Sequence, residues 1–393
     1  MVMRNRDAGR GEPRATAVMR GTPPRGRKLH IFPETGQIMR SKTRFATSLS
    51  GAALAAVAAV AIPLGGTARA AQAKLSETGS TLLYPLFNLW AAEYTDAQIT
   101  TQGTGSGAGI SAAISGTAQI GASDAYLANA QMKSNPGMLN IPLAISSQMV
   151  NYNVPGLNNQ HLKLSGPVLA EIYQGKVKYW DDPAIAKPNP GVKLPHDAIV
   201  PIHRSDGSGD TFMFTQYLSY STPDWSNSLG YGTTVTWPAV DGAIGAVGNP
   251  GVVNALKSTP YSIAYIGISF KNATSWAGLG VARLKNRDGK FVLPGVTTVS
   301  AAANEMSAKT PPDERLGLIF APGAQSYPII NYEYAIVKRQ QPNPDTAKAL
   351  REFLSWAINP KGGSARDYLQ AVGFIALSKP IVKLSEKQIQ KIE

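Results

Sequence analysis

The sequence predicts an α/β fold, because short apolar segments of strand length alternate with amphipathic segments of helical periodicity. The chain has 393 residues, of which 43% are hydrophobic, so it is long enough to bury the cores of two domains. Connections rich in Gly, Pro and Asn separate the segments at 153–166, 181–197 and 241–251, and a further polar stretch covers 303–328.

The basic charge of the chain is concentrated near its beginning. Residues 1–73 hold 12 Lys and Arg against 3 Asp and Glu, which leaves 26 against 22 in residues 74–393. The formal charge of +13 therefore does not predict a nucleic-acid-binding surface on the main part of the chain. The absence of cysteine excludes disulfides, thiolate metal sites, cysteine nucleophiles and a lipid-anchoring cysteine.

Residues 39–73 have the pattern of a secretory signal peptide. The basic segment MRSKTR precedes the apolar segment SGAALAAVAAVAIPLGG, and ARAAQA then offers cleavage after Ala70 or Ala73. An uncleaved anchor is the alternative, although the apolar segment is short for a membrane span. Residues 1–38 are either a disordered extension or the result of a start codon assigned too far upstream, and we favour Met39 as the true first residue.

The first two helices are each expected after a turn rich in Gly and Ser or Thr. One follows Gly79-Ser80-Thr81, and its apolar face comprises Leu83, Leu86, Phe87, Trp90 and Tyr94, with Pro85 in the first turn. The other begins near Ser106-Gly107, and its face comprises Ile110, Ala113, Ile114 and Thr117. A short strand after this helix ends at Asp124.

A third turn has the same character. The strand AIVPIH (198–203) enters the turn RSDGSGD (204–210), and the following helix carries Phe214, Tyr217 and Leu218 on one face. Two further strands are expected at 262–269 and 329–337. The C-terminal region is expected to form a helix at 346–358 and a short polar surface helix within 384–393.

Turns of this kind can bind anions. The first N–H groups of a helix lack backbone partners and lie at the positive end of its dipole, while glycine allows close approach and hydroxyl groups add donors. A single such turn is most often just a helix cap. Three of them together with Arg204 favour an anion site.

Other site types have weaker support in the sequence. The segment GTGSGAG suggests a dinucleotide-binding turn, but it lacks a convincing buried strand before it and an acidic residue at the end of the next apolar strand. The four histidines have no metal-ligand spacing, and there is no G-x-S-x-G motif. No metal, cofactor or catalytic residue is therefore expected, and His203 is interpreted as a strand-end residue.

Five segments resemble the periplasmic phosphate-binding proteins of high-affinity phosphate ABC importers: TGSTLLYP, QGTGSGAGI, GASDAYL, YQGKVKYWDDPAIAKPNPGVKLP and HRSDGSGDTFMFTQYL. The resemblance covers essentially all of 75–380, and it is greatest to the actinobacterial branch through ETGSTLLYPLFNLW and RSDGSGDTF. Members of that branch are usually lipoproteins. Because this chain has no cysteine at its cleavage site, we expect a freely soluble protein in a true periplasm.

The resemblance implies a two-lobed periplasmic binding protein type II fold with the ligand in the interlobe cleft. The chain would cross between the lobes twice, near 147–152 and 326–332. Lobe one would then comprise 74–148 plus 329–393, and lobe two would comprise 152–326. The implied role is high-affinity binding of inorganic phosphate and its delivery, as a monomeric subunit, to an inner-membrane ABC permease with a cytoplasmic ATPase.

The resemblance also implies phosphate contacts. Ser80, Thr81 and Leu82 would supply backbone N–H groups and a hydroxyl, and Ser106 would supply both. The remaining implied contacts are Ser208, Gly209 and Asp210 at the third helix start, Arg204 as the cation held by Asp206, and Asp124 as acceptor of a phosphate proton.

The aspartates would select the anion. At neutral pH phosphate carries at least one proton and sulfate carries none, so a buried Asp124 carboxylate can accept a bond from phosphate but repels sulfate. Asp210, where many relatives have threonine, either accepts a second proton or acts as a helix cap. The alternative functions are binding of another tetrahedral oxyanion, a phosphate-ester hydrolase, or an adhesive surface protein.

Overall fold

The computed structural model describes residues 72–393. The expected extension at 1–38 and almost all of the expected signal peptide lie outside these residues. The first strand, β1, begins at Ala73. Cleavage after Ala70 would leave this strand whole, whereas cleavage after Ala73 would remove its first residue.

The described chain alternates strands and helices, as the sequence predicts. The strands are β1 (Ala73–Gly79), β2 (Ala97–Thr100), β3 (Ile120–Ser123), β4 (Met138–Asn153), β5 (Lys163–Leu164), β6 (Val200–Arg204), β7 (Ile244–Ala246), β8 (Ser262–Gly267), β9 (Gly280–Val281), β10 (Arg283–Lys285), β11 (Phe291–Val292) and β12 (Ile330–Lys338). The α-helices are α1 (Tyr84–Glu93), α2 (Ser106–Ser115), α3 (Asn129–Ser134), α4 (Gly166–Tyr173), α5 (Pro183–Ala186), α6 (Gly209–Ser221), α7 (Pro223–Ser228), α8 (Gly248–Ser258), α9 (Lys271–Trp276), α10 (Val296–Met306), α11 (Pro344–Ala357), α12 (Arg366–Ala371) and α13 (Lys379–Ile389). Short 3-10 helices cover Ile268–Phe270 and Ser307–Lys309.

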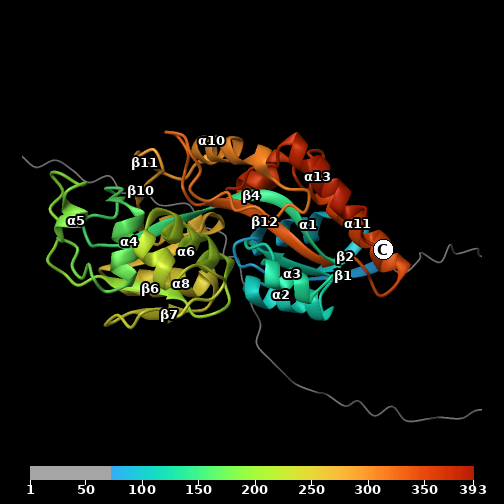
Figure 1. Cartoon of the computed structure of the whole chain (residues 1–393), viewed down its shortest axis with the longest axis horizontal. Helices are drawn as coiled ribbons and strands as arrows, with labels where there is room; N and C mark the ends of the chain where they lie inside the picture. The colour runs from blue at the N-terminus through green and yellow to red at the C-terminus, as the bar shows by residue number, and fades with distance from the viewer. Residues whose placement is uncertain (1–71) are drawn as a thin grey trace, which may run out of the picture. The chain divides into compact units, whose positions relative to one another are not determined.

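The main sheet is organised around the long strand β4. Its strand order is β2-β1-β3-β12-β4-β8-β6-β7, with β9 also paired to β4, and a separate small sheet has the order β11-β10-β5. The first part of β4, up to Ser147, pairs antiparallel with β12, and the part from Gln148 pairs antiparallel with β8. Figure 1 shows β4 and β12 running between the blue-to-teal and red elements on one side and the green-to-yellow elements on the other.

The strands expected at 198–203, 262–269 and 329–337 are present as β6, β8 and β12, with ends shifted by at most two residues, and the short strand expected to end at Asp124 is β3, which ends at Ser123. The strand at the centre of the sheet, β4, was not among them. Nearly every β4 residue is buried, so the strand lacks the alternation of apolar and polar residues that marks a half-exposed strand.

Helices α1 and α2 follow the predicted pattern, with small differences. Pro85 occupies the first turn of α1, and the predicted apolar face of that helix is buried. Helix α2 ends at Ser115 and is capped by Gly116, whose φ of 80° lies in the left-handed region, so Thr117 is outside the helix and exposed. The prediction that Thr117 belongs to its buried face is therefore wrong.

Helices α6 and α13 differ more from expectation. Residues 209–219 of α6 are all buried, because α4, α7, β6 and β8 pack around the helix. The residues of the predicted apolar face are thus buried, but the opposite face of the helix is buried as well. Helix α13 begins earlier than expected and buries Ile381 and Ile389, so it packs on the body and is not merely a polar surface helix. No helix in the 72–393 region has the length and apolar character needed to cross a membrane.

Candidate functional site

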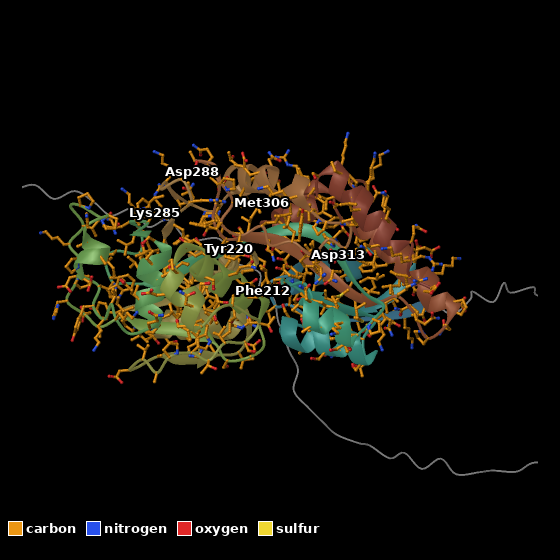
Figure 2. The ribbon with its side chains drawn as sticks, viewed as in Figure 1. Phe212, Tyr220, Lys285, Asp288, Met306 and Asp313 are labelled. Atoms are coloured by element: carbon orange, nitrogen blue, oxygen red, sulfur yellow. The ribbon has the colours of Figure 1, made fainter. Side chains whose placement is uncertain are left out.

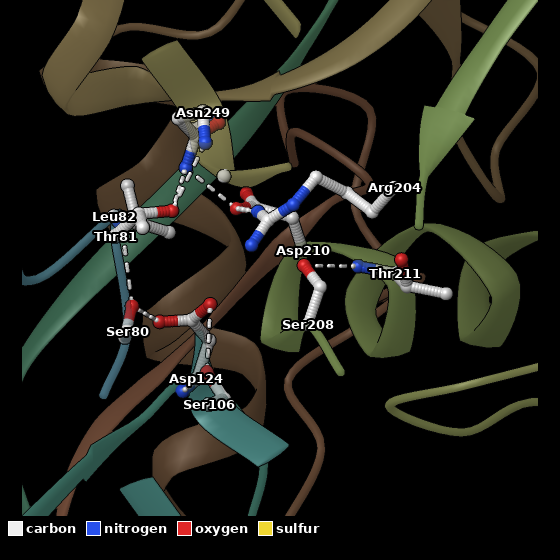
Figure 3. Close-up of polar contacts among 12 residues, drawn as sticks. Ser80, Thr81, Leu82, Ser106, Asp124, Arg204, Ser208, Asp210, Thr211 and Asn249 are labelled. Carbon is white, nitrogen blue, oxygen red and sulfur yellow. Dashed lines mark hydrogen bonds and ion pairs between the residues drawn. The ribbon is translucent and has the colours of Figure 1, made fainter. Parts of the chain in front are cut away.

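The fold brings the three predicted turns together at one buried place (Figure 3). We call this group the buried cluster, and its members are Ser80, Thr81, Ser106, Asp124, Arg204, Ser208 and Asp210. Each is at most 5% exposed. The members follow β1, begin α2, follow β3, end β6 and begin α6, so five elements position them.

Arg204 is the cation of the cluster and is held by two aspartates. Its Nε donates to Asp206 Oδ1 at 2.7 Å and its Nη2 contacts the other oxygen of Asp206, while Nη1 donates to Asp210 Oδ2 at 2.9 Å. Burial alone lowers the pKa of Arg204, but the bond with Asp206 and the charge of Asp210 raise it above its ordinary value. The predicted partnership of Asp206 with Arg204 is thus present in the structure.

Asp124 lies at the carboxyl end of β3, with a carboxylate that contacts two predicted serines. Ser80 Oγ donates to Asp124 Oδ1, and Ser106 Oγ lies 3.4 Å from Oδ2. Burial raises the pKa of Asp124, while neighbouring donors and Arg204 act in the opposite direction. The carboxyl therefore lies in a dry environment in which it can accept a hydrogen bond from an acidic proton.

Some of the expected donors are already used within the protein. The Ser80 amide donates to the Ala122 carbonyl at 2.9 Å, and the Leu82 amide donates to Ser80 Oγ at 3.1 Å. The Ser208 amide donates to the Thr233 carbonyl at 2.8 Å. The Ser80 and Leu82 amides, which the resemblance implies as phosphate donors, are therefore bonded within the protein, the first to a carbonyl of β3 and the second to a side chain of the turn before α1.

Four other amides have no such partner. In the described part of the chain, the N–H groups of Thr81, Ser106, Gly209 and Asp210 donate to no protein acceptor. Ser106 is the first residue of α2, and Gly209 and Asp210 are the first two of α6, so the helix ladder cannot satisfy them. These buried donors need an acceptor from outside the protein.

Glycines allow the turns to approach one another. A Cβ on Gly209 would lie 2.3 Å from Asp124 Oδ2 and 2.5 Å from Ser106 Oγ, so the start of α6 packs directly against those two side chains. The Gly107 amide donates to the Gly207 carbonyl at 2.9 Å. This bond joins the start of α2 to the turn before α6.

Asp210 makes contacts that neither sequence interpretation includes. Its Oδ2 accepts from Asn249 Nδ2 at 2.6 Å as well as from Arg204, and its Oδ1 accepts from Gln148 Nε2 at 3.0 Å. Ser208 caps α6, since its Oγ accepts from the Thr211 amide at 3.2 Å. Burial and the charge of Asp124 raise the pKa of Asp210 to about 7 against the opposing effect of Arg204.

Sequence reasoning missed Asn249 and Gln148. Asn249 also donates to Thr81 Oγ1, from its amide at 3.1 Å and from Nδ2 at 3.0 Å, and so links the turn before α1 to Asp210. Asn249 belongs to the first turn of α8, in a Gly- and Asn-rich segment that is expected from the sequence to be a connection. Gln148 lies inside β4, where no local sequence signal marks it.

A surface crevice adjoins the buried cluster. Its volume is about 830 Å³, and its lining includes Ala125, Phe212, Thr233 and Asp313. Ala125 follows Asp124 in the chain, and the Thr233 carbonyl accepts the Ser208 amide. Phe212 and Asp313 are labelled among the side chains of Figure 2, where they help to locate the crevice.

Comparison with known proteins gives consistent likenesses. A family model described as a PBP superfamily domain matches residues 65–361. The phosphate-binding protein PstS of Methanocaldococcus jannaschii is 34% identical, with 80% of this chain and 85% of the relative covered. PstS of Pasteurella multocida is also 34% identical, with 81% and 88% covered. The structure of the high-affinity periplasmic phosphate-binding protein PfluDING with bound phosphate matches with a TM-score of 0.63 at 20% identity, covering 80% of this chain and 92% of that chain.

These likenesses identify the fold as the two-lobed type II fold of the PBP superfamily. The chain belongs to the PstS family of phosphate-binding proteins. The finer likeness to the actinobacterial branch stays a prediction.

Proposed function

We propose that this protein binds inorganic phosphate with high affinity and delivers it to an ABC-type phosphate importer. The observation that carries the proposal is the buried cluster. It combines one guanidinium, the Asp124 carboxylate and four amides that have no acceptor within residues 72–393. The family membership supports the same function, because the relatives compared above are named as phosphate-binding proteins.

The donors and acceptors of the cluster match protonated phosphate. The amides of Thr81, Ser106, Gly209 and Asp210 would bind unprotonated phosphate oxygens at the helix starts. Arg204 would neutralise part of the charge, and Asp124 would accept the bond from a P–OH group. Sulfate has no proton to offer at neutral pH, so a buried carboxylate in this position disfavours it.

The predicted lobe boundaries are part of the proposal. Lobe one would comprise 74–148 plus 329–393, and lobe two would comprise 152–326. The change of β4 pairing partner between Ser147 and Gln148 supports the first crossing. The pairing of Ile330 with Ser147 supports a second crossing beside it.

The biological setting follows from this role. We infer that the protein acts in the periplasm after cleavage of its signal peptide, as a monomeric binding subunit without a lipid anchor. It would dock on inner-membrane permease subunits driven by a cytoplasmic ATPase, and it would bind phosphate without converting it chemically.

Calorimetric titration tests the proposal. The purified protein is unfolded and refolded to remove carried-over anion, and phosphate and sulfate are then titrated in parallel at about pH 7. We expect one-to-one phosphate binding and no measurable sulfate binding. The Asp124→Asn variant should bind phosphate at least roughly tenfold more weakly and should gain sulfate binding, since its neutral amide can donate to either anion.

An exposed aspartate provides the matched control for this test. Asp345 lies in the first turn of α11, so Asp345→Asn should leave both titrations unchanged. Comparable binding of sulfate and phosphate by the unmodified protein would replace the proposal with a general oxyanion receptor. Absence of phosphate binding would reject the proposal outright.

A further inference from the structure

A third buried carboxyl group faces the buried cluster. Glu333 is fully buried on β12, and Tyr334 of the same strand pairs with Ser123 at the end of β3. This antiparallel register places Glu333 opposite Asp124, the residue that follows Ser123. Asn331, two residues earlier on β12, donates from Nδ2 to the Asp124 carbonyl at 2.7 Å, which fixes this alignment.

The two oxygens of Glu333 have different surroundings. Ser146 Oγ, from β4, donates to Oε1. Within residues 72–393, Oε2 is buried and has no hydrogen-bond partner. An ionised carboxylate with an unpartnered buried oxygen would cost folding free energy, because its charge is removed from water without compensation. A protonated carboxyl group carries no net charge and can donate a hydrogen bond.

The surrounding charges also oppose ionisation of Glu333. Asp124 at the end of β3 and Asp210 at the start of α6 are the acidic groups that act on it. Arg204 at the end of β6 is paired with Asp206 and Asp210. Burial, followed by the nearby Asp124, raises the pKa of Glu333 well above its ordinary value.

We propose that Glu333 keeps its proton on Oε2 and directs it towards Asp124, as a positioning residue that keeps Asp124 ionised and ready to accept a bond from phosphate. This inference rests on the proposed phosphate binding and adds the residue that maintains the acceptor. Glu333 thus donates one hydrogen bond to Asp124 from within the protein. Its strand, β12, is far from the three turns in the sequence. A hydrogen bond from Glu333 lowers the pKa of Asp124 and so opposes the increase that burial causes.

Two substitutions separate the proton from the shape of the side chain. Glu333→Gln retains the length and a neutral donor, whereas Glu333→Met retains the length and removes the donor. We expect the Gln variant to bind phosphate within about threefold of the unmodified protein at about pH 7. The Met variant should bind roughly tenfold more weakly, because the Asp124 carboxylate loses a supporting donor.

Infrared spectroscopy detects the proton directly. A protonated carboxylic acid has a C=O stretching band that an ionised carboxylate lacks, and Glu333→Gln should remove one such band. Glu314→Gln is the matched control, because Glu314 is also fully buried, has a pKa raised by burial to about 8 and bonds Ser385 and not the cluster. This control should lose its own band and retain full phosphate affinity.

Loss of the band in Glu333→Gln together with retained affinity supports the inference. An unchanged spectrum, or a Gln variant as weak as the Met variant, overturns it, as does a Met variant of full affinity. The spectrum and the Gln titration decide the question even where the Met variant fails to fold. If the unmodified protein binds no phosphate, the proposed function fails, while the infrared band still decides whether Glu333 holds a proton.

Discussion

Arg204 is the single cation of the buried cluster, and its guanidinium is divided between Asp206 and Asp210. Although burial raises the pKa of Asp206, the bond with Arg204 holds it below its ordinary value. Asp210 behaves differently, because it is more deeply buried and close to Asp124. The two aspartates bound to the same guanidinium thus have pKa values shifted in opposite directions. Asp206 stays ionised and anchors Arg204, whereas Asp210 titrates near neutral pH.

The first residue-scale prediction concerns Asp210. Its pKa of about 7 means that the carboxyl is mostly charged at about pH 8 and mostly neutral at about pH 6. A charged Asp210 repels the anion, so phosphate affinity should rise as the pH falls over this range. The Asp210→Thr variant should show a smaller rise when titrated calorimetrically at both pH values.

The matched control for Asp210 is Asp345→Thr, which changes an exposed aspartate in the first turn of α11. Its pH profile should coincide with that of the unmodified protein. Identical profiles for Asp210→Thr and the unmodified protein would show that Asp210 does not respond to protons in the site.

At the scale of elements, the start of α6 decides how closely the site can close. Gly209 is the first residue of this helix, and it lies against Asp124 after β3 and Ser106 in α2. The atoms that a Cβ would meet include Asp124 Cβ at 2.6 Å as well as the Asp124 and Ser106 oxygens, so a methyl group fits only if the helix start is displaced. The displacement would move the helix start away from the donors of α2.

Gly209→Ala should therefore weaken phosphate binding by roughly tenfold or more, and overpacking at the buried helix start should lower the melting temperature modestly. Calorimetry and thermal unfolding measure the two quantities. Gly251→Ala is the control, since it lies within α8 and its Cβ would be 3.8 Å from its nearest neighbours. A large fall in melting temperature for Gly209→Ala would show that this glycine serves folding and not the site.

At the scale of the whole molecule, the described chain buries acids that lie outside the buried cluster. Glu77 on β1 is 2% exposed, and within residues 72–393 neither of its carboxyl oxygens has a hydrogen-bond partner. Burial raises its pKa from 4.5 to about 8. The folded protein therefore holds this proton over a pH range in which the unfolded chain has released it.

The free energy of unfolding should consequently fall as the pH rises from about 4.5 to about 8, with Glu77 contributing at most about 5 kcal/mol. Urea unfolding at several pH values measures the slope. Glu77→Gln should reduce the slope, whereas Glu386→Gln, which changes an exposed residue of α13, should not. Equal slopes for the unmodified protein and Glu77→Gln would mean that Glu77 is ionised in the folded state.

Short-range patterns in the sequence predict the local features of this protein. Three Gly- and Ser-rich turns, the helices α1 and α2 that follow two of them, and the placement of Asp124 and Arg204 at strand ends were all readable from short-range patterns. These features depend on residues within a few positions of one another, because helix periodicity and turn chemistry are local. The pairing of Asp206 with Arg204 is also local, since only one residue separates them in the sequence.

The central strand and the long-range contacts of the site depend on tertiary structure. Strand β4 is buried nearly throughout and carries no alternating pattern, so its central place emerges only when β12 and β8 pair with its two parts. The contacts of Asn249 and Gln148 with the cluster, and the position of Glu333 beside it, bring together residues that are far apart in the chain. Which amides remain free was likewise a tertiary outcome, because the acceptors that occupy Ser80 and Ser208 are carbonyls on other segments. These contacts depend on the pairing of strands that are distant in the sequence, and no short stretch of sequence specifies that pairing.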